Sequence, residues 1–166
     1  INGVSKSYAM TGWRIGWIAG PKWIADACNK LQGQYTSGAC AVAQKAAEAA
    51  YTGEQICVRK MCEAFERRKN LVVDLIRQIP GLKVNDPQGA FYVFPDCSAY
   101  IGKSYQGKTI NDSAELAMYL LEVGHVASVG GVAFGAPHCI RFSYATSDEN
   151  LKIAFARIKE ALAQLK

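Results

Sequence analysis

Residues 54–79 read EQICVRKMCEAFERRKNLVVDLIRQI and form the clearest secondary-structure signal in the chain. Apolar side chains recur in this stretch three, four or seven positions apart, which is the spacing of one helix face; they are Val58, Met61, Phe65, Val72, Leu75 and Ile79. Pro80-Gly81 follows and ends the pattern, because proline lacks the amide proton that a continuing helix needs. The stretch therefore predicts a long amphipathic helix packed against a core.

The segment before this helix predicts a short strand followed by two helices. Apolar residues alternate with others from Trp13 to Trp17, as they do on the two faces of a strand. Residues 22–51 are rich in alanine and helical in pattern, and the turn-forming residues 36–38 (TSG) interrupt them. Two helices are therefore expected in this segment rather than one.

Short strands and two further helices are predicted after Pro80. Alternation between turn residues places strands at 82–84, 90–94, 125–129 and 139–144. Two pairs of residues have the spacing of helix-capping boxes, so helices are expected to start at them; the pairs are Asp112 with Glu115 and Thr146 with Glu149. Strands mixed with longer helices predict an α/β or α+β layered fold.

Composition and charge exclude several classes of protein. Half of the 166 residues are apolar, enough to bury a core, so a disordered chain is excluded. The net charge is +5, but the 19 basic residues are scattered among 14 acidic ones, which is not the pattern of a nucleic-acid-binding surface. No apolar run has the length of a membrane span. Neither nucleic acid nor a membrane is therefore expected as a partner.

The cysteines and histidines do not form a metal site. No two cysteines have C-x-x-C spacing and no histidine lies at zinc spacing from them, so no metal is expected. His125 and His138 are interpreted as structural. The cysteines lie mostly in apolar stretches and are expected to be buried free thiols of a reducing cytoplasm; they are Cys28, Cys40, Cys57, Cys62, Cys97 and Cys139.

Three motifs carry a resemblance to a known family. Residues 4–17, VSKSYAMTGWRIGW, resemble the cofactor-lysine signature of class I aminotransferases of fold type I. The resemblance continues at residues 89–92 (GAFY) and 140–147 (IRFSYATS), in the order in which the family has these motifs. In detail the chain is most similar to the bacterial branch of aspartate aminotransferases. The whole chain can be aligned with the carboxy-terminal portion of that family.

The resemblance implies a fold and a division into domains. It implies an α/β fold in which residues 1–52 are the terminal piece of the large domain that binds pyridoxal 5'-phosphate. Residues 53–166 are then the carboxy-terminal small domain, of α+β type, with a mixed sheet and flanking helices. The chain begins at Ile1 rather than methionine, and we expect it to be a carboxy-terminal fragment.

Lys6 is the residue to which the resemblance assigns the cofactor. An isolated lysine in such a context is usually a surface side chain whose apolar stem packs on the protein. A primary amine can, however, form a Schiff base with an aldehyde when its surroundings keep part of it neutral. The motif around Lys6 favours the second role, so Lys6 is predicted to be both the catalytic residue and a cofactor ligand.

Arg14 and Ser5 are the candidates for holding the cofactor phosphate. A guanidinium offers permanent charge and a fork of donors that suits a phosphate dianion. Arg14 matches the phosphate-binding arginine of the family and is expected to be buried, because Trp13, Gly16 and Trp17 surround it. Ser5 matches less closely, since many relatives have a hydroxyl residue at the position of Gly3.

Arg141 and Phe91 are the candidates for binding substrate. Cys139, Arg141 and Ser143 are expected to share one face of a strand that residues alone would place at a sheet edge. The resemblance implies that Arg141 binds the substrate α-carboxylate through paired hydrogen bonds. Phe91 matches a position that lines the same pocket, although an aromatic side chain in a strand is as often part of a core.

The glycines near residue 130 do not make a nucleotide site. Gly130-Gly131 and Gly135 lack both the P-loop and the dinucleotide-binding spacing. A loop near the substrate entrance is the interpretation that their sequence favours.

The activity that the resemblance implies is transamination. An amino group would pass from an amino acid, by resemblance aspartate, to a 2-oxo acid such as 2-oxoglutarate, with Lys6 moving the proton as general base and acid. The family's other cofactor contacts come from upstream of the lysine, and relatives form homodimers with active sites at the interface. The isolated chain is therefore expected to bind cofactor weakly and to be inactive.

Other functions stay open at this point. The same cofactor chemistry also supports β-elimination by a lyase, and the same fold supports aromatic aminotransferases. A third alternative is a folding or dimerisation fragment with no chemistry of its own. Analysis of the reaction products separates the first two from aspartate transamination, and substitution of Lys6 tests the third.

Overall fold

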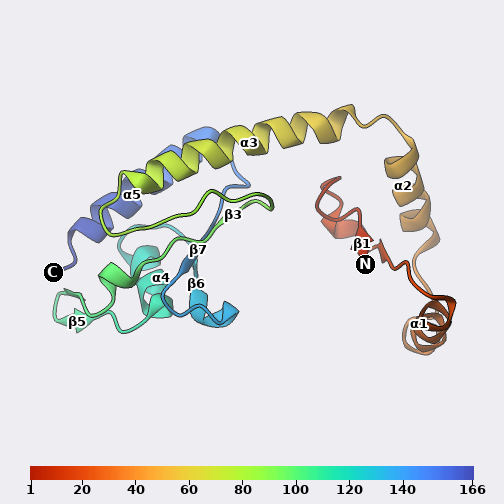
Figure 1. The fold of residues 1–166 in the computed structure, drawn as a ribbon, viewed down its shortest axis with the longest axis horizontal. Coiled ribbons are helices and arrows are strands. Elements are labelled where there is room, and N and C mark those ends of the chain that lie inside the picture. Colours follow the sequence, from red (N-terminus) through yellow and green to blue (C-terminus); the bar gives the residue numbers. More distant parts are fainter. The chain divides into compact units, whose positions relative to one another are not determined.

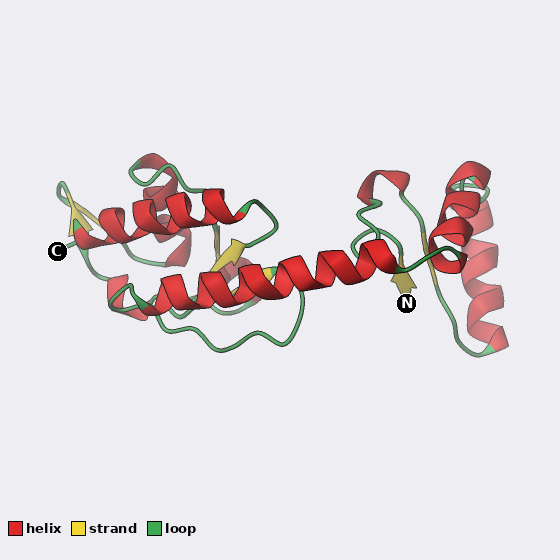
Figure 2. Ribbon diagram, turned by 90° about the horizontal axis from the view of Figure 1, so that it is seen from above, coloured by secondary structure: helices red, strands yellow, loops and turns green.

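The computed structural model describes all residues from 1 to 166 and divides them into two compact units, residues 1–62 and 63–166. Figure 1 shows the order of the elements and Figure 2 their type. The longest helix, α3 (Ile56–Arg77), runs through the boundary between the units. Its position agrees with the predicted amphipathic helix. The boundary predicted after residue 52 precedes this helix, whereas the two compact units meet within it.

The first unit begins with two very short strands and continues into two helices. Strand β1 (Asn2–Gly3) pairs antiparallel with β2 (Gly16–Trp17), and the 3-10 helix η1 (Thr11–Trp13) lies between them in the chain. Helices α1 (Lys22–Tyr35) and α2 (Ala41–Thr52) follow. Two helices were predicted here, and the break at residues 36–38 is confirmed.

The strand predicted from Trp13 to Trp17 is wrong in most of its length. Arg14 has the left-handed backbone conformation, with φ of 52°, and this reverses the chain directly after η1. Only Gly16 and Trp17 pair with β1. Gly3 and Gly16 allow this pairing, because a Cβ built on Gly3 would lie 3.1 Å from the Cα of Gly16. The tryptophans are about half exposed, 47% for Trp13 and 46% for Trp17.

The second unit is built on a three-stranded antiparallel sheet in the order β3-β7-β6. Its strands are β3 (Tyr92–Val93), β6 (Val129–Gly130) and β7 (Ile140–Ser143). Two helices complete the unit, α4 (Ser113–Glu122) and α5 (Asp148–Ala163). The smaller elements are a hairpin of β4 (Ser104–Tyr105) and β5 (Lys108–Thr109), and the 3-10 helices η2 (Ser98–Tyr100) and η3 (Gly131–Phe134).

The core of the second unit lies where the sheet and its three helices meet. Buried side chains come from every one of these elements and include Val72 and Ile76 of α3, Leu116 and Leu120 of α4, Phe155 and Ile158 of α5, and Val93, Ile140 and Phe142 of the sheet. Helices packed on a small sheet confirm the predicted fold class, but the prediction of a mixed sheet is wrong for this chain. Every strand pair within this chain is antiparallel.

The strands are shorter than predicted, and strand β7 lies in the centre of its sheet instead of at the edge. Residues 82–84 contribute only a single bridge, between Lys83 and Asp96, and residues 125–129 contribute only Val129 to β6. Strand β7 is the central strand, so its prediction as an edge strand is wrong. Alternation along one strand shows which face is buried, but it does not show how many neighbours the strand has.

One predicted helix start is confirmed and the other lies one residue later. The Asp112 carboxylate accepts hydrogen bonds from the amides of Ala114 and Glu115, as the N-cap of α4. At α5 the N-cap is Ser147 rather than the predicted Thr146, because the Ser147 hydroxyl accepts from the amide of Asn150 at 3.2 Å. Thr146 instead accepts from the side-chain amide of Asn150.

All six cysteines are free thiols, but the prediction that they are buried is wrong for most of them. Cys97 is buried and Cys139 is half-buried. Burial raises the pKa of Cys97 to about 12, so this thiol stays protonated. The exposed thiols are Cys28, Cys40, Cys57 and Cys62.

Gly130 and Gly131 allow close backbone contacts at two places. A Cβ built on Gly130 would lie 2.7 Å from the Cα of Ala114, at the start of α4. A Cβ built on Gly131 would lie 2.0 Å from the carbonyl oxygen of Ala136 and 2.5 Å from that of Cys139. The Gly131 amide donates to the Cys139 carbonyl and to the hydroxyl of Ser113, which is completely buried. The glycine pair, interpreted from sequence as an entrance loop, is therefore a packing contact that fixes β6 and η3.

Substitution of Gly131 by alanine is expected to destabilise the chain by roughly 1–3 kcal/mol, because backbone atoms must move to admit the methyl group. Urea denaturation measures this change. Gly89→Ala is the matched control in the same unit, since nothing lies within 4 Å of a Cβ at Gly89. Equal stability of the two variants would contradict the close approach.

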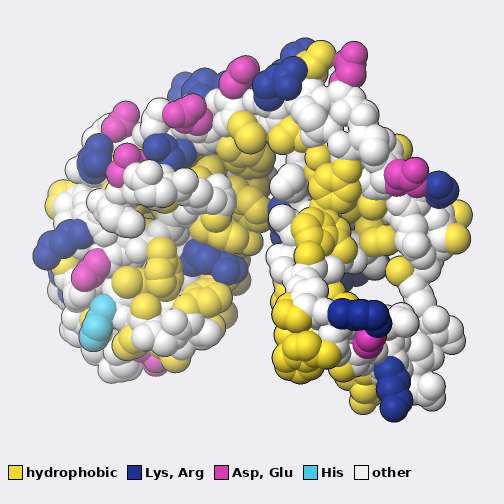
Figure 3. Space-filling view, turned by 45° about the vertical axis from the view of Figure 1, so that its right-hand side comes forward, with side chains coloured by type: hydrophobic (Ala, Val, Ile, Leu, Met, Phe, Trp, Pro, Cys, Tyr) yellow, Lys and Arg dark blue, Asp and Glu magenta, His cyan; other side chains and the backbone are white.

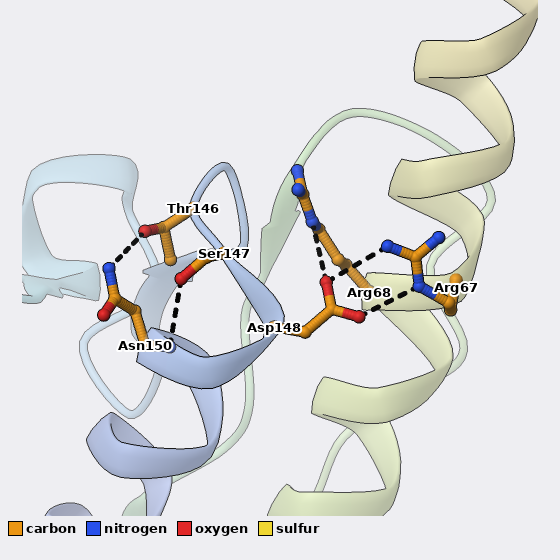
Figure 4. Close-up of polar contacts among 6 residues, drawn as sticks. All are labelled: Arg67, Arg68, Thr146, Ser147, Asp148 and Asn150. Atoms are coloured by element: carbon orange, nitrogen blue, oxygen red, sulfur yellow. Dashed lines mark hydrogen bonds and ion pairs between the residues drawn. The ribbon is translucent and has the colours of Figure 1, made fainter.

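The start of α5 is tied to α3 by one carboxylate and two guanidinium groups (Figure 4). Arg67 Nε lies 2.9 Å from one oxygen of Asp148, and Arg68 Nε lies 3.1 Å from the other. The hydrogen bond from Arg67, followed by the one from Arg68, lowers the pKa of Asp148 to about 2. Because Asp148 is the first residue of α5, its negative charge also suits the amino-terminal end of the helix dipole.

Asp148→Asn is expected to lower the melting temperature of the chain at pH 7. A carboxylate whose pKa is lowered by folding stabilises the fold above its unfolded pKa of about 4 and loses that contribution as pH falls towards its folded pKa. The difference between wild type and variant should therefore shrink below about pH 4 and vanish near pH 2.

Asp74→Asn provides the control for this prediction, because Asp74 lies 3.8 Å from Arg77 in a pair in which both side chains are well exposed. Such a pair contributes little to stability. A melting temperature of Asp148→Asn equal to that of wild type at pH 7 would show that the arginine pair does not hold α5.

Candidate active site

Lys6 lies on a tight turn directly after β1. The turn covers residues 5–8, and two backbone hydrogen bonds close it, from the amide of Tyr8 to the Val4 carbonyl at 3.2 Å and from the amide of Ala9 to the Lys6 carbonyl at 3.1 Å. Val4 is almost fully buried and anchors the turn, whereas Lys6 is exposed. The lysine is therefore presented at the surface by a fixed backbone.

Thr11 joins this turn to Arg14. Its hydroxyl donates to the carbonyl of Ser5 at 3.2 Å, and its own carbonyl accepts from Nη1 of Arg14 at 2.9 Å. The guanidinium of Arg14 thus folds back onto the backbone that follows the lysine turn. These contacts bring the predicted residues Ser5, Lys6 and Arg14 onto one closed loop.

Aromatic side chains attach this loop to the end of α2. The Tyr8 hydroxyl donates to Oε1 of Gln55 at 2.8 Å, and the Tyr8 ring meets that of Tyr51 edge to face at 5.4 Å. Tyr51 in turn accepts a 2.8 Å hydrogen bond from the indole of Trp17. Both sides of the loop are therefore held by the same tyrosine, which limits how far Lys6 and Arg14 can separate.

The burial predicted for Arg14 is wrong in this structure. Arg14 is exposed, and so are Trp13 and Trp17 on either side of it. The prediction inferred burial from the residues around Arg14, but the strand is confined to Gly16 and Trp17, and the left-handed turn at Arg14 precedes it with these side chains exposed. The first unit exposes more large apolar side chains, among them Trp23, Leu31, Tyr35 and Val42, which are between 62% and 80% exposed. Figure 3 shows hydrophobic side chains at the surface of the molecule.

Arg141 lies on β7 in the second unit, on the face that points away from the core. Its neighbours Ile140 and Phe142 are buried, which confirms the predicted alternation. The guanidinium carbon of Arg141 lies 4.3 Å from the ring centroid of Tyr92 and 4.4 Å from that of Phe134. The cation is therefore enclosed by aromatic side chains.

Phe91 belongs to the same group of side chains. Its ring lies 4.5 Å from the ring of Tyr92 and 6.1 Å from that of Phe65, between centroids. The Phe91 carbonyl accepts from the amide of Tyr144, which extends the pairing of β3 with β7. Both predicted substrate residues, Phe91 and Arg141, are therefore brought together, with Tyr92 between them.

The backbone beside Phe91 is held in a conformation that costs energy. Ala90 has a φ of 62°, which residues with a side chain rarely adopt. Its carbonyl accepts a 2.9 Å hydrogen bond from the hydroxyl of Tyr144. This contact fixes the loop before β3 and the direction in which Phe91 leaves it.

The two rings around Arg141, Tyr92 and Phe134, were not predicted from the sequence. Tyr92 lies within the GAFY motif, but only Phe91 was selected from it. Phe134 lies beside the glycines that were interpreted as an entrance loop. The presence of an aromatic residue in the GAFY motif and another close to the glycines could have suggested these two positions. No local pattern, however, shows that both rings contact the same arginine.

The two histidines, His125 and His138, show no catalytic or metal-binding arrangement. The His138 carbonyl accepts from the amide of Cys97 at 2.7 Å, so His138 contributes its backbone to the fold. His125 has a φ of 53° in the turn after α4. No group of three or more histidine, cysteine or acidic side chains is arranged to hold a metal. No helix is long and apolar enough to cross a membrane.

Comparisons with known proteins identify the family. Residues 1–158 match the family model of aminotransferase class I and II. A bifunctional aspartate and glutamate/aspartate-prephenate aminotransferase of Petunia hybrida is 48% identical over all of this chain and 36% of its own length. An aspartate aminotransferase of Streptomyces avermitilis is 45% identical over all of this chain and 41% of its length. The chain belongs to the class I and II aminotransferases.

Solved structures give the same result for the fold. The aspartate aminotransferase of Rhizobium meliloti superposes with a TM-score of 0.94 at 44% identity, covering 99% of this chain and 42% of that one. An aromatic aminotransferase of Pyrococcus horikoshii gives 0.87 at 35% identity, covering 98% and 42%. The chain therefore has the fold of the corresponding part of these enzymes, and it spans about two fifths of the length of the relatives it matches.

The residues on the Lys6 loop fit the cofactor that this family implies in general, pyridoxal 5'-phosphate. One loop offers an amine that can react with an aldehyde, a guanidinium that can pair with a phosphate, and a hydroxyl at Ser5. The side chains of Lys6 and Arg14 are exposed, so both are accessible to a ligand.

Proposed function

We propose that this chain is the carboxy-terminal part of a pyridoxal-phosphate-dependent aminotransferase that transfers the amino group of aspartate to 2-oxoglutarate. The observation that supports this most strongly is the closed loop on which Thr11 holds the turn of Lys6 and the guanidinium of Arg14 together. A merely structural lysine would need no such partner, whereas a cofactor with an aldehyde and a phosphate needs both groups at a fixed separation.

Lys6 holds the cofactor, and Arg14 binds its phosphate. When bound, the cofactor supplies an electron sink for the electrons of the bond that breaks at the substrate Cα. Arg14 pairs with the phosphate as a forked cation, and the hydroxyl of Ser5 adds a hydrogen bond to it. The contact of the Arg14 guanidinium with the Thr11 carbonyl supports this role, because the Thr11 hydroxyl in turn contacts the lysine turn at Ser5.

Lys6 also moves the proton. Once the amino group of the substrate has displaced it from the cofactor, the Lys6 amine would remove the proton from the substrate Cα as a general base and donate it to C4′ of the cofactor as a general acid. Arg141 binds the α-carboxylate of the substrate through two parallel hydrogen bonds, which orients the Cα–H bond for this step. Phe91 lines the pocket beside it and excludes water from one side.

The substrate assignment follows the relatives. Those most similar over the whole chain are named aspartate or aspartate/prephenate aminotransferases, and one solved relative, from Thermus thermophilus, is an aspartate aminotransferase with the dicarboxylate maleate. The Pyrococcus horikoshii aromatic aminotransferase favours aromatic amino acids as the second candidate class of substrate. Half-reaction spectra of the full-length enzyme with aspartate and with phenylalanine decide between them.

The working form is proposed to be a cytoplasmic homodimer. The exposed apolar side chains of the first unit are ones that the rest of the large domain and a partner subunit would cover in the full-length enzyme, since folded proteins rarely expose apolar patches of large area. Six free thiols without a disulfide support a reducing compartment.

Lys6→Ala in the full-length enzyme is expected to reduce kcat by at least about 1,000-fold, since it removes both the cofactor attachment and the proton carrier. Lys22→Ala is the matched control, because Lys22 is also an exposed lysine of the first unit and forms only a surface ion pair with Asp26. A coupled assay with aspartate and 2-oxoglutarate measures both variants. Retained activity of Lys6→Ala would assign the chain a structural role. Release of pyruvate and ammonia from an amino acid that carries a leaving group on Cβ, tested in a separate assay, would assign a lyase.

The 166-residue chain alone is expected to bind pyridoxal 5'-phosphate weakly and to show no transaminase activity, because it covers only about two fifths of its relatives. A titration followed by absorbance, with turnover measured in the same samples, tests this. Tight binding together with turnover of aspartate would contradict the requirement for the remaining part of the fold.

A further inference from the structure

The position of Arg141 in the sheet places an aromatic side chain on each side of it. Strand β7 lies between β3 and β6, and Arg141 is paired with Val129 of β6. Tyr92 of β3 is paired with Ser143, which shares a face with Arg141 because side chains alternate along a strand. Phe134 ends η3, which directly follows β6. One ring therefore approaches from each neighbour of β7.

Both rings are close enough to interact with the charge. The guanidinium carbon lies 4.3 Å from the Tyr92 centroid and 4.4 Å from the Phe134 centroid, well inside the distance of about 6 Å at which a cation and a ring attract each other. A guanidinium is planar, and all five of its N–H groups lie in that plane. Rings that cover its faces leave the in-plane donors for a ligand.

The two rings are themselves fixed by other rings. Tyr92 contacts Phe91 at 4.5 Å between centroids, and Phe134 meets Phe94 edge to face at 5.9 Å. Phe94 belongs to the chain directly after β3, so the two ends of the arrangement are linked through the sheet. Each ring around Arg141 thus contacts a second aromatic ring, and Phe134 is 48% exposed.

We propose that Tyr92 and Phe134 are positioning residues that hold the Arg141 guanidinium in the orientation in which it binds a carboxylate. This inference rests on the proposed function, in which Arg141 binds the substrate α-carboxylate. Because the rings already order the guanidinium, binding of a carboxylate does not have to restrict the rotamers of Arg141. Less binding free energy is then lost as side-chain entropy. The rings act through Arg141 and do not touch the reacting atoms.

The orientation of Arg141 can be measured without cofactor or substrate. In an NMR spectrum of the 166-residue chain, protons of the Arg141 side chain are expected upfield of those of the other arginines, because ring currents shield groups above an aromatic face. Phe134→Leu, which keeps an apolar side chain but removes the ring, should move these signals downfield. Tyr105→Leu is the control, because Tyr105 packs on Tyr119 in the hairpin region and not on Arg141.

The consequence for binding is measured with maleate in the full-length enzyme by titration calorimetry. Phe134→Leu and Tyr92→Leu are each expected to raise the Kd for maleate about threefold to tenfold, and Phe134→Tyr and Tyr92→Phe to restore it to within about twofold. In the aminotransferase assay the Leu variants should raise KM for aspartate more than they lower kcat. Rescue by the aromatic variant separates a ring–cation contact from simple packing.

The two arms of the experiment separate failure of this inference from failure of the proposed function. An unshifted Arg141 signal in the wild-type chain, or a Leu variant that binds maleate as tightly as wild type, overturns the positioning role. A shifted signal in an enzyme that does not transaminate overturns the proposed function and leaves the ring contact standing. Because the wild-type spectrum needs no substitution, a variant that fails to fold does not remove the test.

Discussion

Burial of Ile140 and Phe142 in the core of the second unit is the constraint on which the rest of that unit depends. These side chains lie on one face of β7, and strand geometry then forces Arg141 and Ser143 onto the other. A slip of the register by one residue would bury the arginine and expose both apolar side chains. The same hydrophobic contacts that fold the unit therefore also select the face on which the candidate carboxylate-binding cation is presented.

Packing around β7 then determines what surrounds that cation. Gly130 lets the chain approach the start of α4, where the Gly131 amide donates to the hydroxyl of the buried Ser113, and Phe134 at the end of η3 then lies beside Arg141. On the other side, the pairing of Tyr92 with Ser143 brings β3 alongside. The first unit positions its candidate residues with hydrogen bonds in place of a core. The Thr11 hydroxyl donates to the carbonyl of Ser5, beside Lys6, and the Thr11 carbonyl accepts from the guanidinium of Arg14.

Local patterns predicted the features that depend on neighbours in the sequence. The helical spacing of apolar residues predicted α3, and the turn residues predicted the break between α1 and α2. Asp112 indicated the start of α4. The three motifs identified Lys6, Arg14, Phe91 and Arg141. Features set by contacts between distant segments were missed: the left-handed turn at Arg14, the central place of β7 in the sheet, and the rings of Tyr92 and Phe134 around Arg141. Alternation along a strand shows which face is buried but leaves the identity of the neighbours undetermined.

Lys6 and Arg141 lie in different compact units. The proposed transamination requires that Lys6 and Arg141 act on the same substrate molecule in the full-length enzyme. The attachment of the cofactor is the step that most directly separates a catalytic chain from a structural one. Reduction of the full-length enzyme with borohydride in the presence of pyridoxal 5'-phosphate, followed by mass spectrometry of its peptides, tests this attachment. A pyridoxyl group on the peptide that contains Lys6, and on no other lysine peptide, is the predicted result. Modification of a different lysine, or of none, would contradict it.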